Sequence, residues 1–65
     1  MITNRQEALE QLEKSISSGQ DVYADALQEF LFYYDQKNLV AANKIRDKIN
    51  ADFKEYPKIE MEVTR

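Results

Sequence analysis

Apolar residues recur at three- and four-residue steps over residues 21–37, which is the period of one face of an α-helix. The stripe consists of Tyr23, Ala26, Leu27, Phe30, Leu31 and Tyr34. Beyond Glu29 the polar side disappears, because Phe32 and Tyr33 lie off the stripe, roughly 100° apart around the helix. A helix that is apolar all round is buried all round. We therefore predict a central helix that is covered either by two flanking helices or by a second copy of the chain.

A narrower apolar stripe precedes the central helix and predicts a first helix over residues 4–18. Its members are Ala8, Leu9, Leu12 and Ile16. Thr3 and Gln6 have the spacing of a capping box at its start. Gly19, the only glycine, suits the left-handed position that follows a helix. The connection into the central helix is then short, which predicts antiparallel or steeply crossed neighbours.

The cleanest amphipathic pattern predicts a third helix over residues 39–56. Its stripe is Leu39, Ala42, Ile45, Ile49, Phe53 and Tyr56. Asn38 is placed to cap this helix, and Pro57 follows its end, where it disfavours helix for the residue before it.

The pattern changes to strict alternation in the last eight residues, 58–65. Ile59, Met61 and Val63 alternate with Glu60, Glu62 and Thr64. This alternation is typical of a half-buried strand, which needs a partner for its backbone amides. Three partners are open: the same strand in a second copy, the segment Met1–Thr3, or another protein. The alternative is a tail that lies on the helices through Ile59 and Met61.

These elements define an all-α fold: a three-helix domain over residues 1–57 and a C-terminal extended tail or strand over 58–65. A chain of 65 residues has a small core, and this one contains neither cysteine nor histidine. It therefore lacks the disulfide and the common metal ligands that reinforce small domains, so we predict a homodimer. The predicted interface residues are Phe32, Tyr33, Ile59, Met61 and Val63.

Charge and hydropathy narrow the classes of protein. The net charge of −3 is mild and argues against a dedicated nucleic-acid binder, which needs a basic footprint. No stretch approaches the length of an apolar membrane span, and the N-terminus has no apolar run of a signal peptide. We expect a cytoplasmic protein that does not bind membranes.

The titratable residues predict no catalytic, metal or cofactor site. Glu7, Glu10 and Glu13 follow one another along the first helix, and Glu60 and Glu62 share a face of the tail. Paired carboxylates need a concave, partly dry site before they act in acid–base chemistry, and a chain this short offers little room for one. We interpret them as solvated faces. Tyr23, Tyr34 and Tyr56 are interpreted as core residues.

Two functions remain. The first is a small non-catalytic protein-interaction module that regulates or inhibits a partner protein. It rests on analogy, because compact, acidic, cysteine-free chains of this size are common among regulators carried by phages and mobile elements. The alternative is a nucleic-acid-associated accessory factor that uses the only basic cluster, Lys44, Arg46 and Lys48 of the third helix. Asp47 dilutes that cluster, so we interpret it first as a solvated face.

Overall fold

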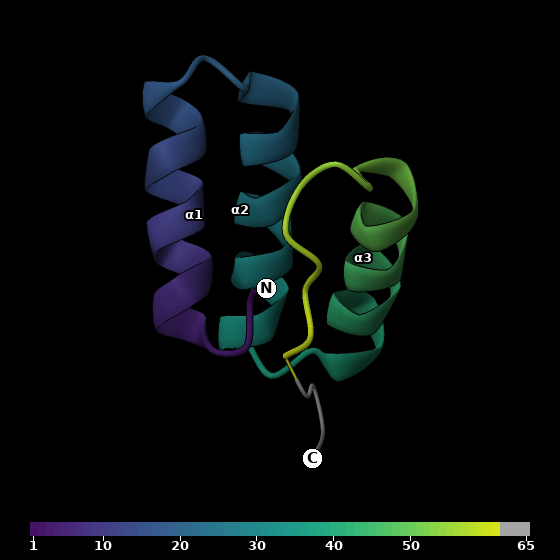
Figure 1. The fold of residues 1–65 in the computed structure, drawn as a ribbon. Helices are drawn as coiled ribbons and strands as arrows, with labels where there is room; N and C mark the ends of the chain where they lie inside the picture. Colours follow the sequence, from purple (N-terminus) through teal and green to yellow (C-terminus); the bar gives the residue numbers. More distant parts are fainter. Residues whose placement is uncertain (62–65) are drawn as a thin grey trace.

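Three helices form the fold, as the sequence predicts (Figure 1). The computed structural model describes residues 1–61, and its helices are α1 (Arg5–Ser17), α2 (Asp21–Asp35) and α3 (Leu39–Asp52). Successive helices run in opposite directions. Among the helices, α2 contacts both α1 and α3, whereas α1 and α3 do not contact each other. The predicted central position of α2 is thereby confirmed.

The N-terminus of α1 is capped one residue later than the sequence pattern predicts. Asn4, not Thr3, is the N-cap, and its Oδ1 accepts from the Glu7 amide at 2.9 Å. The Glu7 carboxylate reaches back and accepts from the Thr3 amide at 2.7 Å. Asn is at least as good an N-cap as Thr, and an ionised Glu accepts more strongly than a neutral Gln. The predicted Thr3–Gln6 capping box is therefore wrong by one residue.

Gly19 makes the turn between α1 and α2. Its φ is +74°, and its amide donates to the carbonyl of Ile16 at 3.2 Å. A residue with a side chain is strained at this φ, even though the space around a Cβ there is open. The predicted left-handed role of this glycine is confirmed.

Helix α3 begins as predicted and ends earlier than predicted. The Asn38 side chain caps it by accepting from the amide of Ala41. The helix stops at Asp52, and a turn closed by the Tyr56 amide and the Phe53 carbonyl follows. The predicted extension to Tyr56 is wrong, because Phe53 and Tyr56 leave the helix and fold back onto Tyr23.

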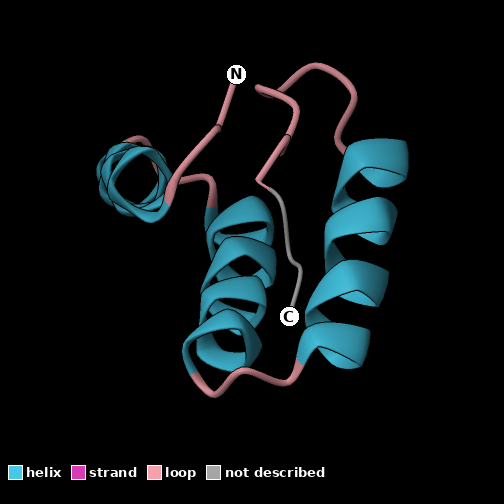
Figure 2. Ribbon diagram, turned by 90° about the horizontal axis from the view of Figure 1, so that it is seen from below, coloured by secondary structure: helices cyan, strands magenta, loops and turns pink. Residues whose placement is uncertain are grey.

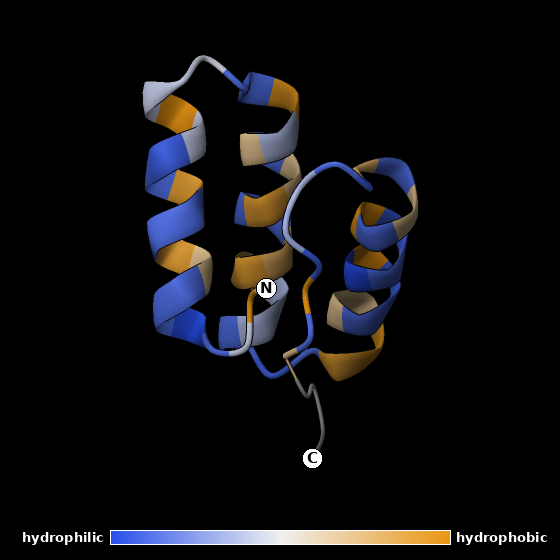
Figure 3. Cartoon of the chain, in the orientation of Figure 1, coloured by the Kyte–Doolittle hydropathy of each residue, from blue (hydrophilic) through white to orange (hydrophobic). Residues whose placement is uncertain are grey.

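The core is built mainly on α2 and is closed by both ends of the chain. Hydrophobic positions follow α2 along its length (Figure 3). The buried apolar residues are Ile2, Ala8, Tyr23, Ala24, Leu27, Phe30, Leu31, Ala42, Ile49, Ile59 and Met61.

On α1 the predicted stripe fails at Ile16, which is 58% exposed, while Ser15 is fully buried. Ser15 is tolerated in the interior because its hydroxyl donates to the Gln11 carbonyl at 2.8 Å.

The two terminal segments lie side by side as loops (Figure 2). The Ile2 amide donates to the Lys58 carbonyl at 2.8 Å, and the Glu60 amide donates to the Ile2 carbonyl at 2.7 Å. This single parallel bridge replaces the predicted strand over the part of the tail that the structure describes. Of the three partners that the sequence left open, the segment around Ile2 is the one that the bridge uses. Val63 lies outside the described residues.

Candidate interaction surfaces

The aromatic stretch at the end of α2 is divided between the core and the surface. Phe30 and Leu31 are buried within the chain, whereas Phe32 is 55% exposed and Tyr33 is partly exposed. The Phe32 and Tyr33 rings meet edge to face, with their centroids 5.2 Å apart and their planes at 80°. The chain alone thus covers part of the apolar surface for which the sequence predicted a second copy. The homodimer itself stays a prediction.

Polar side chains surround this aromatic pair on the preceding turns of α2. Asp25, Gln28, Glu29, Phe32 and Tyr33 line a shallow open depression of about 420 Å³. We call these residues the α2 face. Helix α2 contains no Lys or Arg, and neither carboxylate of the α2 face forms an ion pair within the described part of the chain. The α2 face therefore has aromatic rings at the end nearer the C-terminus of α2 and carboxylates without an ion pair on the preceding turns.

Asp35, the acidic residue at the end of α2, differs from those of the α2 face because it forms an ion pair. Asp35 accepts two hydrogen bonds from Arg5 of α1, at 2.8 Å from Nε and 2.9 Å from Nη2. Hydrogen bonding to this guanidinium holds the pKa of Asp35 below its ordinary value. The pair links the start of α1 to the end of α2, so Asp35 has a cation within the chain, unlike Asp25 and Glu29 of the α2 face.

The predicted interface residues of the tail lie inside the chain. Ile59 is 1% exposed and Met61 is 2% exposed. Their backbone groups are also occupied. The Asn50 side chain accepts from the Ile59 amide at 2.9 Å and donates to the Ile59 carbonyl at 3.1 Å, and Arg46 donates to the Met61 carbonyl at 3.3 Å.

These bonds close one edge of the bridged pair, and the bond from the Thr3 amide to Glu7 occupies a donor on the other segment. An added strand would have to displace side chains that already satisfy the backbone. Asn50 lies off the apolar stripe of the predicted third helix, and the sequence pattern assigns it no role. Its amide side chain can both donate and accept, but Asn43 of α3 can do the same, so residue type alone does not identify Asn50.

The basic cluster of α3 is divided as well. Lys44 and Lys48 are exposed, while Arg46 donates to Met61 and to the Asp47 carboxylate at 3.1 Å. A guanidinium held this way is occupied by two acceptors of its own chain. The predicted nucleic-acid contact therefore retains only its two lysines as unengaged groups.

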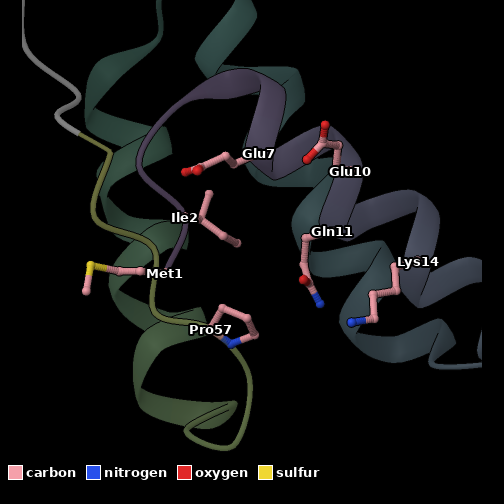
Figure 4. A pocket seen from close by; sticks show the side chains of 7 residues that line it. All are labelled: Met1, Ile2, Glu7, Glu10, Gln11, Lys14 and Pro57. Atoms are coloured by element: carbon pink, nitrogen blue, oxygen red, sulfur yellow. The ribbon is translucent and has the colours of Figure 1, made fainter.

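A second depression, of about 310 Å³, lies beside the terminal segments (Figure 4). Its lining residues are Met1, Ile2, Glu7, Glu10, Gln11, Lys14 and Pro57. Glu7 is already bonded to Thr3, and hydrogen bonding to Thr3 lowers its pKa. In the part of the chain that the structure describes, no three acidic side chains converge as metal ligands would.

The aromatic residue near the start of α2, Tyr23, is buried beneath two partly buried rings from the segment after α3. Tyr23 stacks on Tyr56 with centroids 4.0 Å apart and planes at 15°, and Phe53 lies at 5.3 Å. We call these three residues the aromatic stack. The Tyr23 hydroxyl has no hydrogen-bond partner among the described residues. Burial raises the pKa of Tyr23 to about 12. An unpartnered buried hydroxyl is a cost to stability that packing in the stack must offset.

Comparison of the chain with family models, with curated proteins and with solved structures finds no match. Over residues 1–61, no helix has the length and apolar character needed to cross a membrane.

Proposed function

We propose that this chain is a small non-catalytic protein-interaction module that regulates or inhibits a partner protein, and that it binds this partner through the α2 face. The observation that carries the proposal is the exposure of Phe32 beside Tyr33. A ring pair on a helix surface offers large apolar area at low cost in side-chain entropy, which is the character of residues that dominate binding energy.

Charge favours a partner protein with a basic surface over a second copy of the chain. In a two-fold dimer built on the α2 face, the same patch meets itself. Asp25 and Glu29 would then approach their own equivalents without a cation on α2 to separate them. Like charges brought together in this way disfavour an interface, whereas a basic partner gains from the same carboxylates.

The alternative function, a nucleic-acid accessory factor, has weaker support. It relies on Lys44, Arg46 and Lys48, and Arg46 is engaged within the chain. We expect any binding to DNA or RNA to be weak, non-specific and lost at physiological salt.

The test compares two truncations of exposed apolar side chains on different helices. Phe32→Ala removes the exposed ring of the α2 face, and Val40→Ala removes a 70% exposed side chain of α3. Immobilised wild-type protein is expected to capture a protein from an extract of the source cells, Val40→Ala to capture the same protein, and Phe32→Ala to lose it. Equal capture by both variants, or no capture by the wild type, contradicts the proposal.

The same three proteins decide between a partner and a second copy. The charge argument, unlike the homodimer predicted from the sequence, leads us to expect a monomer near 7.7 kDa for each of them in sedimentation at micromolar concentration. A wild-type dimer that dissociates in Phe32→Ala would instead assign the α2 face to self-association.

A further inference from the structure

We infer that the α2 face recognises an arginine side chain of its partner, whose guanidinium lies against the Phe32 and Tyr33 rings and donates to Asp25 and Glu29. The inference rests on the proposed function and specifies the chemistry of the partner. It starts from a coincidence of two features in one depression: exposed aromatic rings and carboxylates without a cation.

The positions of these residues along α2 bring the two features together. Phe32 follows Gln28 by four residues and Glu29 by three, so all three lie on neighbouring turns of one face. Asp25 lies one further turn toward the N-terminus, and all five residues line the same depression. A flat cation placed there meets ring surface and carboxylate oxygens at once.

A guanidinium fits this combination better than an ammonium group. It is planar, it stacks on aromatic rings, and its fork of N–H donors can serve carboxylates and an amide oxygen at the same time. The hydrogen-bond acceptors available in the depression are the carboxylates of Asp25 and Glu29 and the amide oxygen of Gln28. A lysine ammonium is a compact, strongly hydrated charge, so it would gain less from the rings.

The intramolecular ion pair between Arg5 and Asp35, on the surface, shows that α2 binds a guanidinium through a carboxylate elsewhere. There the helix accepts a guanidinium through both carboxylate oxygens of Asp35. Arg5 is committed to that pair, and Arg46 is committed to Asp47 and Met61. Both arginines of residues 1–61 are thus engaged, and we expect the cation for the α2 face to come from another molecule.

The experiment titrates the isotope-labelled chain with N-acetyl-arginine methylamide and follows its backbone amides by NMR. The matched probes are the lysine analogue and the citrulline analogue, which keeps the shape of arginine without its charge. We expect saturable shifts confined to residues 25–33, with a dissociation constant on the order of millimolar for arginine. Lysine is expected to bind several-fold more weakly, and citrulline is expected to give no saturable shift.

The charge requirement is tested with a double variant and a matched control. Asp25→Asn with Glu29→Gln is expected to weaken arginine binding by about tenfold or more, since it removes both charges but keeps the shapes. Asp52→Asn with Glu55→Gln removes two exposed acids from the α3 end of the chain and is expected to leave binding unchanged. Equal effects of the two double variants would show that only net charge matters and would overturn the inference.

Failure of the inference and failure of the proposed function are distinguishable. If arginine and citrulline give the same response, or arginine causes no saturable shift in residues 25–33, the arginine assignment is overturned. The proposed function survives that result if Phe32→Ala still abolishes capture of the partner. If Phe32→Ala leaves capture intact, both are overturned.

Discussion

The two aromatic groups of α2 differ in what surrounds them, although their residue types are alike. Tyr23 near the start of the helix is enclosed by Phe53 and Tyr56, which the turn after α3 carries over it. Near the end of the helix, Phe32 is exposed, and Tyr33 packs partly against the core while it meets the Phe32 ring edge to face. The segment that follows α3 runs back between α2 and α3, and it is this return that buries one group and not the other (Figure 1). The role of an aromatic residue here is decided by the path of a distant segment.

The largest expected effect is the loss of folding stability when an apolar side chain of the aromatic stack or of the core of α3 is truncated. Phe53→Ala and Ile49→Ala should each lower the free energy of unfolding by roughly 2–5 kcal/mol, because each removes packed apolar atoms. Phe32→Ala should change it by less than about 0.5 kcal/mol, as surface substitutions usually do. Denaturant unfolding of the three variants measures the difference. Similar losses in all three variants would mean that Phe32 contributes to folding stability as a core residue does, which contradicts its exposure.

Sequence reasoning found the elements of this comparison and missed its geometry. The helical periods predicted three helices and placed Phe30, Leu31 and Tyr23 in the core, as the structure has them. They did not predict that α3 would end at Asp52, since a regular stripe continues through Tyr56. A turn and a continued helix place apolar residues at the same spacing over so short a distance, so periodicity does not separate them.

The candidate site was predictable in part. Phe32 and Tyr33 stand out in sequence because they lie off the stripe of α2, but that angle did not decide whether a flanking helix or a second copy covers them. The burial of Ile59 and Met61 was one of the alternatives that the sequence left open, because alternation says that one side of a segment is apolar but not what covers it. The two bonds from Asn50 to Ile59 depend on tertiary approach, which leaves no signal in local pattern.

The second effect is a loss of stability at alkaline pH that comes from the buried Tyr23 hydroxyl. Its pKa is raised from 10.0 to about 12 in the folded chain, so the folded state keeps the phenol proton more tightly than the unfolded state does. The associated stability is complete below pH 10 and is lost as the pH rises toward 12. At about 1.4 kcal/mol per pKa unit, the loss is about 3 kcal/mol at most.

The matched variants are Tyr23→Phe and Tyr33→Phe, one from each aromatic group. Tyr23→Phe should remove much of the alkaline loss and should be neutral or slightly stabilising near pH 7, because it deletes an unpartnered buried hydroxyl. Tyr33→Phe should unfold with pH as the wild type does. Denaturation midpoints between pH 8 and pH 12 are the measurement, and identical profiles for both variants would contradict the burial of the Tyr23 hydroxyl.

The third effect concerns the segment after α3, which packs over Tyr23 and is held to α3 by Asn50. Asn50→Ala leaves the amide and carbonyl of Ile59 without their side-chain partners, which should cost about 1–3 kcal/mol. Amide hydrogen exchange at Ile59 should become faster, and Lys48→Ala, an exposed position two residues from Asn50, serves as the control. Unchanged protection of the Ile59 amide in Asn50→Ala would mean that the segment is held by other contacts.

The smallest effect is expected at the end of α2 nearest the exposed pair. Arg5→Ala removes the cation that lowers the pKa of Asp35, and surface ion pairs contribute little to stability. The contribution of a lowered carboxyl pKa is present above the unfolded value of about 3.8 and is lost as the pH falls through the folded value. The melting temperatures of wild type and variant should therefore differ by about two degrees at pH 7 and converge below pH 4.

The measurement that tests the central claim most directly is photo-cross-linking from position 32. A photoreactive phenylalanine analogue takes the place of Phe32 in one protein and of Val40 in a second, since both side chains are exposed but lie on different helices. The account predicts a covalent adduct with a partner protein from position 32 and none from position 40. Adducts from position 40 alone, or with equal yield from both positions, would contradict the assignment of the α2 face as the binding surface.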